Sequence, residues 1–103
     1  MIRDEISIGV TNLVINEREY AIREHQYFHS DHEAYSVTLE EVEESEDELQ
    51  KMKWRMTDIW ERVKSDRPIT DDMRKLKGYA IQCACECIQV AAMCDKLLTD
   101  KKD

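Results

Sequence analysis

The chain has 103 residues, of which 42% are hydrophobic and 37% are charged, with only two glycines and one proline. A chain of this length is a single domain with a modest core, and its few turn-forming residues predict long, rarely interrupted helices. The formal net charge of −8 argues against a nucleic-acid binder, because such proteins usually carry a basic patch.

Apolar runs are short, as in VAAM at residues 90–93, and the opening MIRDEISIGV contains no apolar segment typical of a signal peptide. We therefore expect no membrane span and no leader. Four cysteines lie within twelve residues, at positions 83, 85, 87 and 94. Their C-x-C-x-C spacing suits neither disulfides on one helix nor a C-x2-C zinc site, so we expect reduced thiols packed in the core of a cytoplasmic protein.

The first predicted element is a helix over residues 2–28, because apolar residues recur there at intervals of three, four and seven. These residues are Ile2, Ile6, Val10, Leu13, Tyr20 and Phe28. Glu17 and Glu24 fall within the same apolar arc. They could close an acidic pocket or pair with basic residues of a partner.

The second predicted helix covers residues 31–64. Ser30 followed by Glu33 is typical of a capping box, in which the hydroxyl accepts from the Glu33 amide and the carboxylate reaches back to the cap amide. Its apolar residues are Tyr35, Leu39, Val42, Leu49, Met52, Met56, Ile59 and Val63. His25, His29 and His32 surround the break between the two helices. They could hold zinc or serve as surface and capping residues.

The third predicted helix covers residues 70–99, after a linker that contains Pro68. Thr70 is the expected N-cap, with Asp71 and Asp72 favourable at the positive end of the helix dipole. Short connections between long amphipathic helices predict a single all-α domain over residues 1–103, with three antiparallel helices that complete a bundle by self-association.

Acidic residues interrupt the apolar stripe of the second helix in LEEVEESEDELQ, where seven of twelve side chains are carboxylates. At about 100° per residue, Glu41 and Glu48 fall at the edge of the apolar arc, and Glu44 joins them in an i, i+3, i+7 row. Glu40 and Glu43 point away from that arc. The run is either a solvated acidic face or part of a cation site.

Glu86 is the sharper anomaly, because it falls inside the apolar arc of the third helix. A buried carboxylate must be neutralised, paired or bound to a metal. No Lys or Arg lies three or four residues from it on its own helix. A cross-helix ion pair, a hydrogen bond to Tyr or Gln and a functional carboxylate all remain open. If the two helices pack antiparallel, Glu41, Glu44 and Glu48 can meet Glu86, where a hard cation such as Mg²⁺ would offset their repulsion.

HEAYSVTLEEVEE, followed later by ACECIQVAAM, resembles the all-α nucleoside-triphosphate pyrophosphohydrolases, specifically the short MazG-like proteins of phages and Gram-positive bacteria. The resemblance covers roughly residues 28–95. That family carries an E-E-x-x-E motif and a later E-x-x-D motif, which together ligate Mg²⁺ and support hydrolysis of a nucleoside triphosphate to a monophosphate and pyrophosphate. It also implies a dimer or tetramer.

The resemblance implies metal ligands at Glu41, Glu44 and Glu86. The second motif departs at its last position, where Gln89 replaces Asp, so Gln89 is a lesser ligand and the site has one charge fewer. Asp95 points away from Glu86 and cannot replace it. The expected cofactor is Mg²⁺, with Mn²⁺ as a second candidate. A catalytically silent interaction protein and an acidic adaptor without metal are the alternatives to the enzyme.

Further candidate site residues follow from the expected hydrolysis of a nucleoside triphosphate. Glu40 or Glu48 could orient the attacking water as catalytic groups. Lys51 and Arg55 are candidate contacts for the substrate phosphates, and Trp54 is a candidate contact for the base. Surface Lys and Arg are common, so these substrate residues carry less weight than the carboxylates.

Overall fold

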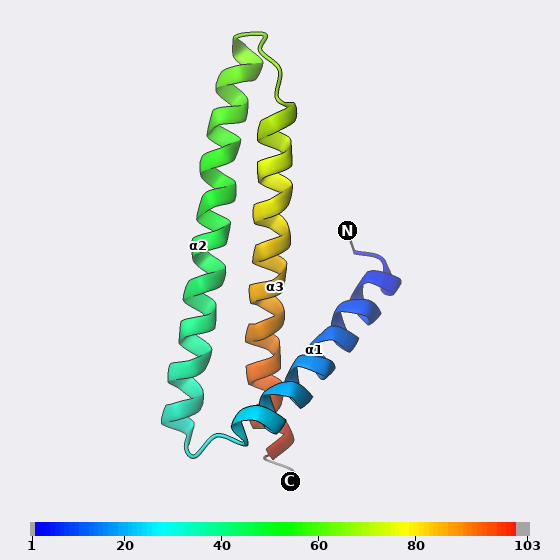
Figure 1. Cartoon of the computed structure of the whole chain (residues 1–103), viewed down its shortest axis with the longest axis vertical. Coiled ribbons are helices and arrows are strands. Elements are labelled where there is room, and N and C mark those ends of the chain that lie inside the picture. Colours follow the sequence, from blue (N-terminus) through cyan, green and yellow to red (C-terminus); the bar gives the residue numbers. More distant parts are fainter. Residues whose placement is uncertain (1, 101–103) are drawn as a thin grey trace.

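The computed structural model describes residues 2–100 (Figure 1). It contains three α-helices, namely α1 (Asp4–His25), α2 (Asp31–Lys64) and α3 (Thr70–Asp100). No strand occurs among the described residues. The all-α class and the three helices expected from the sequence are confirmed.

Helices α2 and α3 form a long antiparallel hairpin, and α1 packs against the C-terminal part of α3 (Figure 1). The N-terminal half of α1 diverges from α3, so the molecule is elongated, with principal extents of 58 × 30 × 22 Å. Its radius of gyration is 17.4 Å, whereas a compact domain of this length has about 13 Å. The hairpin is therefore the body of the structure, and α1 covers one end of it.

The observed helix ends differ from the expected boundaries at both ends of α1 and by one residue at the end of α3. Helix α1 stops at His25 because Gln26 adopts a left-handed φ of 60°, so the expected extension to residue 28 is wrong. Thr70 is the first residue of α3 rather than its cap, and the Met73 amide donates to the carbonyl of Ile69 at 2.9 Å.

The capping box at the start of α2 is present with one change. Ser30 Oγ accepts from the amide of Glu33 at 3.1 Å, as expected. The Glu33 carboxylate accepts from the amide of His29 at 3.1 Å, rather than from that of Ser30. It therefore ties the linker, as well as the cap, to the first turn of α2.

The core of the single chain is small. Its buried hydrophobic residues are Ala21, Ala34, Ile59, Ala92 and Met93. Many residues of the apolar stripes stay open, including Leu13 at 51% and Leu49 at 44% exposure. The accessible surface is 7901 Å², compared with about 6,100 Å² for a typical monomer of this mass. The stripes are therefore only partly covered by this chain alone.

An ion-pair clamp joins α2 to α3 near the tip of the hairpin. Asp72 is only 4% exposed. It accepts from Arg55 Nη1 at 3.0 Å and pairs with Arg62 Nε at 2.7 Å. The sequence indicated only a helix-dipole role for Asp72, whereas its carboxylate is the buried anion that neutralises two arginines of α2.

The four cysteines are all free. Only Cys83 is half-buried, so the expectation that all four pack in the core is wrong for the single chain. Cys85, Cys87 and Cys94 are exposed on α3. Within residues 2–100, no helix is long and apolar enough to cross a membrane.

Candidate metal centre

Carboxylates from two helices converge at the middle of the hairpin. Glu41 and Glu44 of α2 and Glu86 of α3 each offer an oxygen, and these three oxygens lie within 4.8 Å of one another. Glu41 and Glu86 are half-buried, whereas Glu44 is exposed. The sequence suggested that Glu41, Glu44 and Glu48 could all meet Glu86 across an antiparallel hairpin. The hairpin groups Glu41 and Glu44 with Glu86, whereas Glu48 is outside this group.

The pKa values of Glu41 and Glu86 are both raised in this cluster. Burial raises the pKa of Glu41, and the charges of Glu44, Glu86 and Glu40 add to that shift. Burial likewise raises the pKa of Glu86, with a hydrogen bond to Glu44 and the charges of Glu44 and Glu48 adding to it. No Lys, Arg or His of residues 2–100 forms an ion pair with Glu41, Glu44 or Glu86. The cluster therefore lacks a protein counter-charge in this part of the chain.

The raised pKa values make the stability of the metal-free protein depend on pH. Between the ordinary pKa of 4.5 and the raised values, the folded state binds more protons than the unfolded state. Stability therefore falls as pH rises through that window, and the loss persists above it. We expect the thermal midpoint of the metal-free protein to rise when neutral solution is acidified into that window. Glu41→Gln should flatten the rise, and an equally steep rise in that variant would contradict this origin.

Two small neutral side chains, Ser45 and Cys83, contact the helix backbone beside the cluster. Ser45 Oγ donates to the carbonyl of Glu41 at 3.0 Å, and Cys83 Sγ donates to the carbonyl of Ser45 at 3.6 Å. Burial raises the pKa of the Cys83 thiol, and the nearby Cys87, Glu48 and Glu86 raise it further. The thiol therefore stays protonated, and the donors are carboxylate oxygens. An all-oxygen donor set suits hard cations such as Mg²⁺ and Mn²⁺ better than zinc.

Glu40 and Glu48, expected to orient a water, flank the cluster on α2. Glu40 is exposed, and its charge contributes to the raised pKa of Glu41. Glu48 is half-buried and forms an ion pair with Lys51 at 3.1 Å. Lys51 Nζ also lies 6.0 Å from the centroid of the Tyr79 ring. Glu48 is therefore partly neutralised, and Lys51 lies about two turns after Glu44 on α2.

Arg55 and Trp54, expected to contact substrate, are not brought to the cluster. Arg55 is held by Asp72 and by Asp58, the latter at 3.2 Å. Trp54 is 64% exposed. They lie ten and eleven residues after Glu44 on the same helix, which corresponds to about 15 Å. Within one chain, Arg55 stabilises the hairpin rather than lining the carboxylate cluster.

Gln89 makes a contact with α1 that its spacing on α3 did not indicate. It is half-buried, and its Nε2 donates to Glu17 Oε2 at 2.7 Å. An amide that donates through nitrogen keeps its oxygen as a potential ligand atom. Glu17, whose role the sequence left open, therefore places a further carboxylate against Gln89, the residue one turn after Glu86 on α3. The one feature of the sequence that pointed to this contact was the position of Glu17 within the apolar arc of α1.

The other candidates take structural positions. Asp95 pairs with Arg18 of α1 at 2.8 Å, which agrees with its direction away from Glu86. His25 ends α1, His29 lies in the linker and His32 lies in the first turn of α2. Within residues 2–100, only one group of three or more His, Cys, Asp or Glu side chains lies close enough together to hold a metal ion. It consists of Glu41, Glu44 and Glu86. The zinc alternative for the histidines has no such group.

Comparison of the chain with protein-family models, with characterised proteins and with solved structures gave no match. The MazG-like resemblance therefore depends on the motif residues themselves. What the structure adds is their geometry, with Glu41, Glu44 and Glu86 grouped and Gln89 turned toward Glu17.

Proposed function

We propose that this chain is a Mg²⁺-dependent nucleoside-triphosphate pyrophosphohydrolase of the MazG-like type. The single observation that carries the proposal is the convergence of Glu41, Glu44 and Glu86 with no cationic partner among residues 2–100. Clustered carboxylates repel one another strongly in a half-buried seam, and a divalent cation relieves that repulsion. Their order and spacing also agree with the E-E-x-x-E and E-x-x-D pattern.

In the proposed reaction, water attacks the α-phosphorus of a nucleoside triphosphate. A bond forms between the water oxygen and that phosphorus, and its bond to the oxygen leading to the β-phosphate breaks, so that pyrophosphate leaves. The cation supplies charge neutralisation of the phosphates and activation of water. Glu40, which is exposed and adjacent to Glu41, is the better placed of the two candidates to accept the water proton, because Glu48 is shared with Lys51.

Self-association is part of the proposal. The single chain exposes about 1,800 Å² more surface than a typical monomer of its mass. Obligate dimers bury roughly 2,000 Å² or more in total, so a symmetric pair could cover the excess. Open apolar residues occur on α1, such as Ile8 at 61%, and on α2, such as Trp60 at 58%. Light scattering should give the mass of a dimer or tetramer, and a monomer at every concentration would exclude this part.

Calorimetric titration with Mg²⁺ or Mn²⁺ tests the cation site directly. We expect saturable binding that is weakened at least about tenfold in Glu41→Gln, because a neutral amide oxygen replaces a charged ligand. Glu43→Gln is the matched control, because Glu43 is exposed on the same helix and is not part of the cluster. Absence of binding to the unmodified chain would leave only the acidic adaptor.

The second candidate is a catalytically silent helical protein that keeps the cation but not the reaction. Gln89 favours it, because the amide removes a charge from the motif and donates to Glu17. Pyrophosphate release across a panel of canonical and modified nucleotides separates the two. Activity with any nucleotide supports the enzyme, whereas a flat panel with the cation bound supports the silent protein.

Gln89→Asp tests whether the replacement of the motif's Asp by Gln89 affects cation binding and activity. The new carboxylate would face Glu17 in place of a hydrogen-bond donor, so we expect a lower thermal midpoint without metal. We expect tighter Mg²⁺ binding and faster pyrophosphate release, because the added charge favours the cation. Gln89→Asn is the neutral control of the same length. Tighter binding in both variants, or in neither, would contradict a ligand role at position 89.

A further inference from the structure

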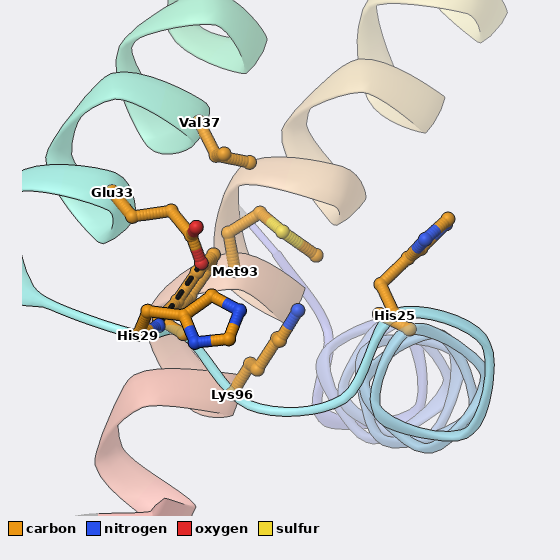
Figure 2. A pocket seen from close by; sticks show the side chains of 8 residues that line it. His25, His29, Glu33, Val37, Met93 and Lys96 are labelled. Carbon is orange, nitrogen blue, oxygen red and sulfur yellow. Dashed lines mark hydrogen bonds between the residues drawn. The ribbon is translucent and has the colours of Figure 1, made fainter.

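A second site candidate lies at the open end of the hairpin, away from the turn that connects α2 to α3. Here α1, the linker after it and the start of α2 meet the C-terminal part of α3. It is a pocket of about 370 Å³. Its apolar wall includes Phe28, Val37 and Met93, and its polar groups are His25, His29, Glu33 and Lys96. Figure 2 shows the Lys96 amine extending into the space between the His29 and His25 side chains. None of these residues belongs to the carboxylate cluster.

Lys96 is the unusual member of this pocket. It is only 4% exposed, although lysine is almost never buried without a partner. Among residues 2–100, no carboxylate forms an ion pair with its amine, and no hydrogen bond from the amine is found. The amine instead lies over the Phe28 ring, whose centroid is 4.3 Å from Nζ. Lys96 is thus a largely buried lysine whose amine reaches the cavity without a hydrogen-bond partner among residues 2–100.

The charged and titratable groups around Lys96 do not supply the missing anion. Glu33 is the carboxylate of the pocket, but its Oε1 accepts from the backbone amide of His29 (Figure 2). His25 and His29 are exposed at the rim and can only add donors or positive charge. Burial lowers the pKa of Lys96, and the charge of Glu33 opposes that shift without cancelling it. Burial therefore disfavours the charged form of the amine, and a bound anion would favour it.

We infer that this pocket binds a small organic anion, whose carboxylate or phosphate group accepts from Lys96 Nζ while its apolar part packs on Phe28, Val37 and Met93. A compact ring bearing one anionic group suits the volume, which is at the lower end for small-molecule sites. The anion would provide the charge-assisted hydrogen bonds that the protein does not. Lys96 lies ten residues after Glu86, about 15 Å along α3, so this site does not depend on the proposed metal centre.

The competing explanation is that Lys96 serves the fold through its contact with Phe28. Lys96→Met separates the two, because methionine keeps an unbranched apolar stem without the charge. If Lys96 serves to bind a ligand rather than to stabilise the fold, the variant should unfold at the same or a higher temperature than the unmodified chain. If the ammonium–ring contact stabilises the fold, the variant should unfold at a lower temperature, which would overturn the inference.

Ligand titrations followed by nuclear magnetic resonance and by thermal unfolding complete the test on the full chain. The probes are benzoate and phenyl phosphate, with benzamide as the neutral analogue. We expect one or both anions to shift signals of Phe28, Val37 and Met93 and to raise the thermal midpoint. Binding of benzamide should be at least about tenfold weaker, because a neutral amide cannot replace the charge. The stronger anion identifies the head group.

Matched variants assign the effect to Lys96. Binding of the better anion should fall at least about tenfold in Lys96→Met. It should be unchanged in Lys77→Met, which removes an exposed lysine from the same helix. Equal binding by Lys96→Met would overturn the inference. Two results with the unmodified chain would also overturn it. One is that neither anion binds, and the other is that benzamide binds as tightly as benzoate.

Discussion

Asp72→Ala should lower the free energy of unfolding by about 3 kcal/mol, the largest loss of stability that we expect from a single substitution. The change removes the carboxylate that pairs with Arg55 at 3.0 Å and Arg62 at 2.7 Å, which leaves Arg62 without its anion and Arg55 with only the more exposed Asp58. Because the core is small and domains are only marginally stable, a loss of this size should be visible in urea unfolding.

Asp71→Ala is the matched control for this effect. Asp71 is the preceding residue, but its side chain is 85% exposed and pairs only with Arg74 on the same helix. Exposed pairs of this kind contribute less than about 1 kcal/mol. If the two substitutions cost the same, the clamp around Asp72 would not be what joins α2 to α3. Hydrogen exchange should also show earlier opening of the hairpin tip in Asp72→Ala.

Glu86→Gln should have opposite effects on activity and on stability. We expect kcat/KM for pyrophosphate release to fall about a hundredfold or more, because the variant removes the only acidic ligand contributed by α3 in the grouped set. The same change removes a carboxylate whose pKa is raised by burial and by Glu44, so the metal-free protein should become more stable at neutral pH. A purely structural carboxylate would not give this combination.

Two comparisons keep this prediction open to contradiction. Glu43→Gln removes the same charge from an exposed position and should leave both activity and stability nearly unchanged. Added Mg²⁺ should raise the thermal midpoint of the unmodified chain by mass action and should do so much less in Glu86→Gln. If Glu86→Gln destabilises the metal-free chain and Mg²⁺ still stabilises it normally, Glu86 is not a ligand.

The carboxylate cluster could be predicted from the sequence because it depends on two regular quantities. Helical periodicity places Glu41 and Glu44 on one face of α2 and Glu86 on the inner face of α3. A short linker after Lys64 then makes α2 and α3 the arms of one hairpin, so residues at similar distances from the turn become neighbours. The contact of Cys83 with Ser45 and that of Asp72 with Arg55 follow the same register.

The contacts of α1 could not be predicted in this way. Periodicity placed Glu17 within an apolar arc, but not the angle at which α1 crosses α3, which sets its hydrogen bond to Gln89. The same crossing, together with the turn at Gln26, encloses Lys96 beside Phe28. Lys96 is an ordinary lysine near the end of an amphipathic helix in the sequence, and nothing in its spacing marks it.

The sequence alone determined the helical class, the hairpin and the helix faces that carry the acidic side chains, because these follow from local periodicity and a short connection. The tertiary structure decided which charges are buried and which are paired: Asp72 within its arginines, Gln89 against Glu17, and Lys96 in a pocket without a counter-charge. Burial and pairing depend on how separate elements dock, and docking is a property of side-chain packing between elements rather than of the pattern within one.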